Sequence, residues 1–199
     1  MNILLIGSTG TLGSAVHSTL TERGHEVITA GRSAGDFRVD ITDPSSVAEL
    51  YDNTGAVDAV ASAAGVVPYK TIHEMTADDY AAAYAGKVRS QIELVRQGVH
   101  RVAPTGSFTL ITGILARTPI VTGTAASMAN GAIEAFVRAA AIEIAPQRVN
   151  AVSPTVFTEA LEAYGDYFPG FPSVDLADVA QAYVRSIEGA QTGHIFAMD

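Results

Sequence analysis

Short apolar runs alternate along the whole chain with longer segments of mixed polarity. The apolar runs have the length of buried strands, and the segments between them repeat their apolar residues at the spacing of amphipathic helices. This alternation predicts an α/β fold, a single domain over residues 1–199 built on a doubly wound parallel sheet of about seven strands with helices on both faces. The expected strands are Asn2–Ile6, Glu26–Thr29, Phe37–Asp40, Ala56–Ala61, Ser107–Thr112, Arg148–Val152 and His194–Met198.

Cap and turn residues place helices between these strands. Gly24 ends the first helix, Asp43 and Pro44 begin the second, Thr76 caps a long one, and Pro146 ends an alanine-rich one. The expected helices are Thr11–Arg23, Pro44–Thr54, Thr76–Gly98, Thr124–Ala145 and Leu176–Glu188, with irregular chain before the last.

The first strand runs directly into three glycines, Gly7, Gly10 and Gly13. At a strand–helix junction this spacing is typical of a loop that binds the pyrophosphate of a dinucleotide. Gly7 allows the sharp turn, Gly10 lets the backbone approach the phosphates, and Gly13 lets the helix pack closely. The amides that open the helix, with the helix dipole behind them, then face the anion. The alternative is a tight turn that binds nothing.

Composition narrows the function classes. The 199 residues are 48% hydrophobic and 17% charged, which suits a full core with buried parallel strands. A net charge of −9 without a basic stripe argues against nucleic acid as a partner, and the absence of cysteine excludes disulfides and thiol chemistry. No apolar stretch approaches the ~20 residues needed to span a bilayer, and no basic leader precedes the first strand. We expect a soluble cytoplasmic protein with no metal site and no membrane partner.

Further segments, in order and at the right spacing, resemble the short-chain dehydrogenase/reductase family over nearly the whole chain. They are Asp40-Ile41, Ala63-Ala64-Gly65, Asn150–Pro154 and Gly189–His194. The runs Gly106–Leu115 and Met128–Ala132 resemble a small bacterial subgroup that keeps the nucleotide fold and lacks the usual catalytic residues. The resemblance implies an NAD(P)-binding Rossmann domain whose cofactor residues include Gly7, Ser8, Thr9, Thr11, Leu12, Gly13, Arg32, Ser33, Asp40, Ile41, Ala63, Ala64, Gly65, Asn130 and Pro154.

The end of the second strand indicates which dinucleotide is preferred. Rossmann proteins that prefer NAD carry an acid there, which binds the ribose 2′-hydroxyl. This chain has Arg32 followed by Ser33 instead, and a guanidinium holds a 2′-phosphate through charge-assisted hydrogen bonds. We therefore expect NADP(H) to be preferred over NAD(H). The alternative is that Arg32 is a solvated loop charge.

The catalytic residues that the resemblance implies are missing. Family enzymes use a tyrosine, a lysine four residues later, a serine on the fifth strand and an asparagine on the long helix. Ala126 and Asn130 stand at the tyrosine and lysine positions, and no Tyr-x-x-x-Lys occurs in the chain. Asn130 can still bond a ribose hydroxyl. The serine position falls at Thr112 or Gly113, and the asparagine position at Lys87.

Lys87 and Thr112 are the candidate catalytic residues. An ammonium at the nicotinamide pocket would polarise a carbonyl or hold a substrate carboxylate, with Tyr84 one turn earlier on the same face. Two alternatives stay open for Lys87: it fills the space of the missing lysine and touches the ribose, or it is a surface lysine without a role. Thr112 would offer a hydroxyl.

Two other regions are expected near the pocket. The first is the loop after the fourth strand, where His73 is a weak candidate for substrate contact. Asp36, by contrast, is interpreted as a solvated turn charge. An aromatic stretch after the sixth strand is expected to form an apolar lid, a subunit contact or a satellite core. Its members are Tyr164, Tyr167, Phe168 and Phe171.

Small residues on the alanine-rich helix permit close helix approach, and the resemblance implies pairing of the two long helices with those of another copy. They are Ala125, Ala126, Ala129, Ala132, Ala139 and Ala140. We expect a homodimer or homotetramer. The function expected is an NADP(H)-binding oxidoreductase that acts on a small, mostly apolar carbonyl or enone with non-standard proton chemistry. The alternative is a catalytically inactive dinucleotide-binding protein with a regulatory or structural role.

Overall fold

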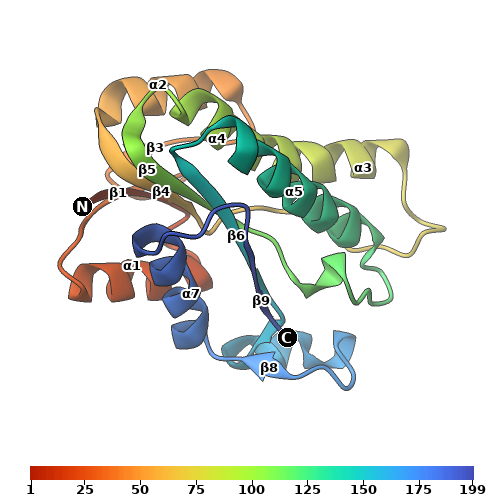
Figure 1. Cartoon of the computed structure of the whole chain (residues 1–199). Coiled ribbons are helices and arrows are strands. Elements are labelled where there is room, and N and C mark those ends of the chain that lie inside the picture. The colour runs from red at the N-terminus through yellow and green to blue at the C-terminus, as the bar shows by residue number, and fades with distance from the viewer.

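A parallel sheet forms the centre of the computed structural model, which describes all residues from Met1 to Asp199 (Figure 1). The strand order is β3-β2-β1-β4-β5-β6-β9, and every neighbouring pair is parallel. The chain reverses its direction of winding between β1 and β4, so the switch point where α/β sheets bind ligands lies at their carboxyl ends. The strands are β1 (Asn2–Ile6), β2 (Glu26–Gly31), β3 (Phe37–Arg38), β4 (Val57–Ser62), β5 (Val102–Ile111), β6 (Arg148–Pro154) and β9 (Ile195–Met198). The predicted fold class is confirmed.

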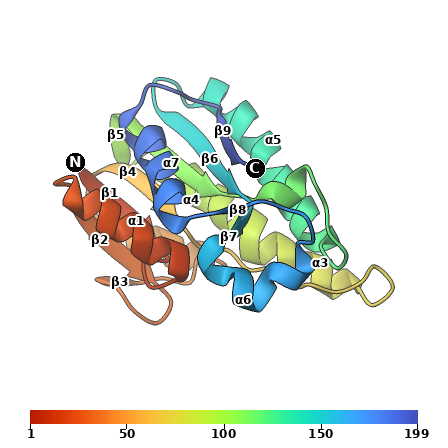
Figure 2. The same ribbon diagram turned by 90° about the horizontal axis from the view of Figure 1, so that it is seen from below.

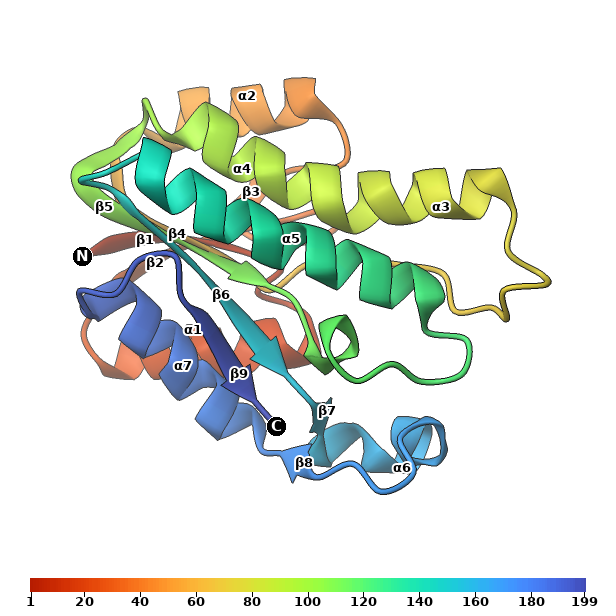
Figure 3. The same ribbon diagram turned by 45° about the vertical axis from the view of Figure 1, so that its right-hand side comes forward.

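Helices cover both faces of this sheet. On one face lie α2 (Pro44–Thr54), α4 (Ser90–Gly98) and α5 (Thr124–Glu143), and on the other lie α1 (Thr11–Glu22) and α7 (Leu176–Glu188) (Figures 1 and 3). The short helix α3 (Ala77–Ala83) extends past the carboxyl end of the sheet. None of the helices combines the length and apolarity needed to traverse a bilayer.

The alternation along β1 shows why both faces need a cover. Leu4 and Ile6 enter the core under α2, α4 and α5, whereas Ile3 and Leu5 enter the core under α1 and α7. All four side chains are buried, and burial of each contributes about 1.5–3 kcal/mol. A strand that is apolar at every position therefore belongs between two helical layers.

The predicted helix 76–98 is the main place where local geometry differs from expectation. It consists of α3, a π-helical turn at Tyr84–Arg89, called the π-turn below, and α4. The Val66 amide donates a hydrogen bond to the Gly86 carbonyl at 3.2 Å, which ties the loop after β4 to this turn. π-Helical turns are rare and concentrate at functional sites.

The segment predicted to be irregular contains short ordered elements. Strands β7 (Val156–Phe157) and β8 (Ser173–Val174) pair with each other, and α6 (Leu161–Tyr164) lies between them in the chain. The three elements lie together past the carboxyl end of β6 (Figures 2 and 3). Strands of two residues and a helix of four are too short to show a hydrophobic periodicity in the sequence.

Four of the six alanines expected at a subunit contact pack inside this chain. Ala125, Ala126, Ala129 and Ala140 are buried, so they pack against other parts of their own chain. Ala132 and Ala139 are exposed. Only these two remain available to a second helix.

Candidate active site

The glycine loop has the geometry that its spacing predicts. Gly7 has a φ of +85°, a conformation that favours glycine, and a Cβ there would lie 3.0 Å from Cβ of Ala64. A Cβ at Gly13 would overlap the Gly7 carbonyl oxygen, so the first turn of α1 packs directly on the loop. At Gly10 the nearest atom would be 3.5 Å away, which leaves the outer side of the loop open.

The start of α1 presents backbone donors without side-chain competition. Gly10 occupies the N-cap position and no side chain caps the helix. The amides of Thr11, Leu12 and Gly13 precede the first intrahelical bond, from Ser14 to the Gly10 carbonyl. Free amides at a helix N-terminus form a site for a phosphate group.

The loop after β2 is folded back on its own strand, and it leaves Arg32 unpaired. Asp36 accepts hydrogen bonds of 2.8 Å from both the amide and the hydroxyl of Thr29. These bonds lower the pKa of Asp36. The carboxylate is exposed, as expected of a solvated turn charge, and it also accepts the hydrogen bonds that hold the loop against β2. Arg32 and Ser33 at the tip of this loop are exposed, and Arg32 makes no ion pair.

The turn after β3 uses its carboxylate internally. Asp40 accepts hydrogen bonds from the hydroxyl and the amide of Thr42 at 2.7 and 2.9 Å. These bonds, with a smaller contribution from the nearby charge of Arg32, lower the pKa of Asp40. Asp40 and Ile41, expected beside adenine, are therefore held in a fixed turn next to Arg32.

Lys87 lies at the carboxyl edge of the sheet between β4 and β5. Its side chain crosses Gly65, where a Cβ would stand 3.0 Å from Cγ of the lysine. Its Nζ donates to the Thr112 carbonyl at 3.4 Å. The side chain is partly buried and has no carboxylate partner, and burial lowers its pKa to about 8. Partial burial argues against a freely solvated surface lysine, and the expectation that Lys87 has a role in catalysis or at the ribose stays a prediction.

Thr112 directs its hydroxyl to a buried carboxylate that the sequence had not marked. The hydroxyl lies 3.3 Å from both Glu134 Oε1 and the Val152 carbonyl. Glu134 on α5 also accepts from Ser153 at 3.0 Å and from Arg117 at 3.1 Å. This network joins the ends of β5 and β6 to α5. The only sequence signal for it was one acid four residues after Asn130 on an apolar helix face.

Asn130 lies where β5, β6 and α5 meet. A Cβ at Gly113 would lie 3.2 Å from Asn130 Nδ2 and 3.6 Å from the carbonyl of Pro154, so these residues adjoin one another. Asn130 is buried, and its Oδ1 has no hydrogen-bond partner in the protein. Because an unpartnered buried acceptor is costly, this oxygen fits a role in binding a ligand hydroxyl.

Ala126, at the family's tyrosine position, is covered by apolar side chains. It forms a small cluster with Ile114 and Leu115, and the rings of Phe168 and Phe171 pack against it. The two rings meet edge to face with centroids 5.4 Å apart. The aromatic stretch was expected to form a lid, a subunit contact or a satellite core. These two phenylalanines belong to a satellite core.

The other predicted positions lie at the surface. Tyr164 and Tyr167 on the same stretch are exposed, and so is Tyr84. His73 is also exposed. His73 makes no hydrogen bond or ion pair with Lys87 or with any other residue, so its contact with a substrate stays a prediction.

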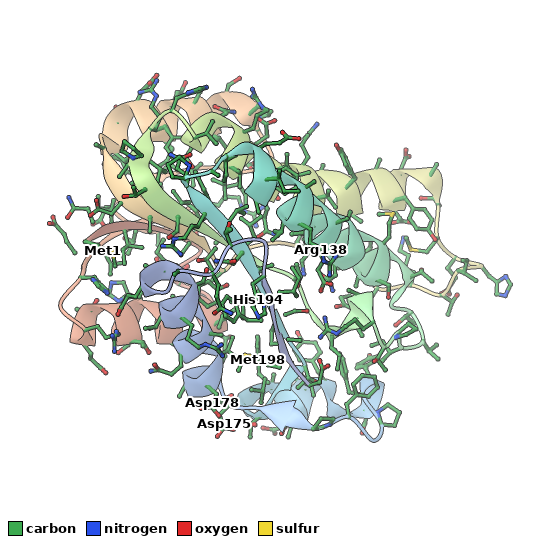
Figure 4. All side chains as sticks on the ribbon, viewed as in Figure 1. Met1, Arg138, Asp175, Asp178, His194 and Met198 are labelled. Atoms are coloured by element: carbon green, nitrogen blue, oxygen red, sulfur yellow. The ribbon has the colours of Figure 1, made fainter.

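A groove of about 700 Å³ lies outside this site, between α7 and β9. It is lined by Asp178, His194 and Met198 among others, on the opposite side of β9 from Arg138 of α5 (Figure 4). β9 is the sheet edge far from β1, so this groove is separate from the glycine loop. No group of three or more acidic or histidine side chains suited to a metal ion is present.

Comparison with known proteins agrees with this geometry. A family model described as Enoyl-(Acyl carrier protein) reductase matches residues 12–189. The chain belongs to the short-chain dehydrogenase/reductase family. The structure of the protein lin1944 from Listeria innocua is similar over the full length of both chains, with 46% identity and a TM-score of 0.98. A small-chain dehydrogenase in complex with NADPH is 26% identical, with a TM-score of 0.89 over 100% of this chain and 96% of the other.

The curated proteins that are similar in sequence to this chain include several reductases. Versicolorin reductase stcU from Emericella nidulans is 27% identical over 176 residues, which are 76% of this chain and 67% of the relative. The chain thus spans about two thirds of the length of the curated relatives it matches.

The residues present fit a nicotinamide dinucleotide. The glycine cradle and the amides that open α1 suit the pyrophosphate, and the unpartnered Oδ1 of Asn130 suits a ribose hydroxyl. The sequence contains no Tyr-x-x-x-Lys, the pair that the resemblance leads one to expect. Lys87 lies beside Gly65 and Thr112, and the pair of Glu134 and Arg117 supplies the other charged groups near Thr112.

Proposed function

We propose that this chain is an NADP(H)-dependent reductase of a small, mostly apolar carbonyl or enone, with Lys87 as its proton donor. One observation carries the proposal: a partly buried ammonium without a carboxylate partner lies at the sheet's switch-point edge, 3.4 Å from the Thr112 carbonyl. A buried cation is costly unless it is paired. Its retention here is what a reaction that develops negative charge requires.

Lys87 supplies the chemistry that the missing tyrosine supplies elsewhere in the family. When bound, NADPH provides the hydride. The Lys87 ammonium donates a hydrogen bond to the substrate oxygen, stabilises the negative charge that develops there and gives it a proton. Burial stabilises the neutral amine left behind, and a pKa of about 8 allows it to regain a proton from water near neutral pH. Asn130 orients the ribose through its free Oδ1.

Arg32 supports the preference for NADP(H). It is exposed, unpaired and placed next to the turn of Asp40, where a 2′-phosphate would meet a free guanidinium. The NADPH complex of a related dehydrogenase supports the same assignment. No acid takes the place of Arg32 at the end of β2, because Asp36 is bound to Thr29.

The test is NADPH oxidation by the purified protein with a panel of small ketones, enones and versicolorin, the compound that names one relative. Lys87→Met is expected to reduce kcat by about 10²–10⁴-fold while leaving the Kd for NADPH within a few-fold. The chain holds one other lysine, Lys70, which is exposed and paired with Asp79, so Lys70→Met is a matched control. Equal activity of the two variants would remove Lys87 from the mechanism.

A second candidate function rests on Ala126. The family's tyrosine position is 1% exposed and sealed by Leu115, Phe168 and Phe171, as expected for a nucleotide-binding protein without catalysis. Such a protein would bind NADPH and change its stability or its partner, with no turnover of any substrate in the panel. Binding without turnover, unaffected by Lys87→Met, favours this function over the reductase.

We also propose that α5 contributes to a homodimer or homotetramer. Small and apolar residues are exposed along α5 in the alternating four- and three-residue spacing of a helix–helix seam. They are Met128, Ala132, Ala135, Ala139 and Ile142. Ala135→Glu is expected to convert the assembly to monomers in light scattering after gel filtration, whereas Ala48→Glu, at an exposed position of α2 outside both long helices, should leave it intact. A wild-type monomer at high concentration would contradict the proposal.

A further inference from the structure

The π-turn touches three loops at the carboxyl edge of the sheet. Gly86 accepts a hydrogen bond from the loop after β4, and Lys87 reaches the Thr112 carbonyl after β5. Arg89, two residues further, reaches the turn after β3: its Nη2 donates to the Thr42 carbonyl at 2.9 Å. One irregular turn of helix thus connects the ends of three strands.

Arg89 is held in an unusual way for a structural arginine. It makes no ion pair, and its Nε is buried without a hydrogen-bond partner. The nearby acid Glu93 is bound instead by Arg96 and Gln97. A partly buried guanidinium with one backbone acceptor and no ion pair is costly, and the charge of Glu93, which Arg89 influences without bonding it, offsets only part of that cost. Stability of the loop alone does not require that arrangement.

The residue that Arg89 holds belongs to the turn of Asp40. Thr42 is bonded through its amide and hydroxyl to Asp40, and its carbonyl is bonded to Arg89, so the turn is fixed from both sides. Asp40 and Ile41 are the residues expected to contact adenine. A change at Arg89 is therefore transmitted to the adenine contact through Thr42.

We propose that Arg89 is a positioning residue for the adenine half of the dinucleotide, acting through the Thr42 carbonyl and the Asp40–Thr42 turn. The inference rests on the proposed function, because it requires the dinucleotide to bind at this edge. It assigns different halves of the ligand to neighbouring residues of one turn, the adenine half to Arg89 and the nicotinamide half to Lys87.

The test is calorimetric binding of three ligands: NADPH, its adenine half 2′,5′-ADP, and its nicotinamide half, reduced nicotinamide mononucleotide. Arg89→Met is expected to raise the Kd of NADPH and 2′,5′-ADP by roughly tenfold or more, since a hydrogen bond from a charged donor is lost. The Kd of the nicotinamide half should stay within about twofold, because no contact to that half is removed. Arg89→Lys, which keeps the charge, should recover part of the loss. Arg96→Met, an exposed arginine of α4, is the matched control.

Each outcome decides the matter. Equal weakening of all three ligands means that Arg89 only supports the fold, and unchanged affinity for 2′,5′-ADP means that the turn does not depend on it; both overturn the inference while the proposed function stands. Wild-type protein that binds neither NADPH nor 2′,5′-ADP overturns both together. Should Arg89→Met fail to fold in a thermal melt, Arg89→Lys carries the test with the same split at smaller size.

Discussion

The two ends of the proposed dinucleotide site differ in what they are made of. The phosphate end is built from backbone, namely glycines and the free amides of α1, and it keeps every feature that the spacing predicts. The chemical end is built from side chains, and there we expect Ala126 and Asn130 at the positions of the family's tyrosine and lysine. A site made of backbone is fixed by the fold, whereas a site made of side chains changes one residue at a time while the fold persists.

The chemical end is nevertheless well ordered. Glu134, Arg117, Ser153 and Thr112 form a hydrogen-bonded network there, and Arg117 also bonds Asp199 at 2.6 Å. Because a buried carboxylate is stable only when its oxygens are satisfied, this network fixes the ends of β5 and β6. A chain without Tyr-x-x-x-Lys therefore still has an ordered hydrogen-bond network at this end of the site.

The largest effect is expected from breaking the phosphate end. Gly13→Ala introduces a Cβ that overlaps the Gly7 carbonyl, so the helix must move off the loop. We expect a loss of about 3 kcal/mol in the free energy of unfolding in urea, together with loss of NADPH binding. Gly131→Ala is the control, because nothing lies within 4 Å of a Cβ there and the change should stabilise α5 by about 0.5–1 kcal/mol. Unchanged binding in Gly13→Ala would contradict the phosphate site.

The next test of the chemical end is the dependence of the reduction rate on pH. The pKa of Lys87 is lowered to about 8, and the ammonium is the form that donates the proton. The reduction rate is therefore expected to be level below pH 8 and to fall about tenfold per unit above it. In Lys87→Arg the break should disappear, because arginine stays protonated throughout this range. A wild-type rate that is flat to pH 10 would exclude Lys87 as the acid.

Restoring the family tyrosine sharpens the comparison. Ala126→Tyr places a large side chain into the cluster of Leu115, Phe168 and Phe171. Overpacking is expected to lower the free energy of unfolding by about 1–3 kcal/mol, and activity should not rise. Chemical denaturation and NADPH oxidation measure the two effects. A stable, more active variant would show that the cluster leaves room for an acid.

A smaller effect is expected for the choice of cofactor. Arg32→Ala removes a charged donor from the 2′-phosphate, so the Kd of NADPH should rise by roughly tenfold while that of NADH changes little. Isothermal titration of both cofactors, with Arg101→Ala as an exposed control on the far side of the sheet, measures the ratio. Parallel changes for NADPH and NADH would show that Arg32 does not read the 2′-phosphate.

The smallest effect lies outside both ends. Glu188 on α7 binds Arg23 and, at 3.0 Å, His25, and these hydrogen bonds lower its pKa to about 2. Because the folded pKa lies below the unfolded value, the contact stabilises the protein above pH ~4.5 and is lost as the pH falls towards 2. Glu188→Gln should flatten the decline in melting temperature between pH 5 and 3 slightly. An identical slope in both proteins would show that this contact contributes nothing.

The sequence revealed the elements whose signals are local. Alternating apolar runs, Gly24 and Thr76 predicted most strands and helices within two residues of their observed bounds, and the glycine spacing predicted the phosphate loop. The strand β5 is the exception, because it begins at Val102, five residues before the predicted start. The π-turn could not be predicted from the sequence, because its residues continue the apolar pattern of an ordinary helix. The role of Glu134 could not be predicted either. Its partners Arg117 and Ser153 lie 17 and 19 residues away in the sequence and meet it only in the folded protein.

The amino-acid sequence by itself determined the doubly wound sheet, the phosphate loop and the absence of the family's tyrosine and lysine. These depend on periodicity, glycine positions and residue identity, which need no partner. Only the tertiary structure decided that Lys87 is partly buried and unpaired, that Thr112 faces Glu134, and that Arg89 reaches the turn after β3. Burial and hydrogen bonding belong to pairs of distant residues, so they exist only once the chain has folded.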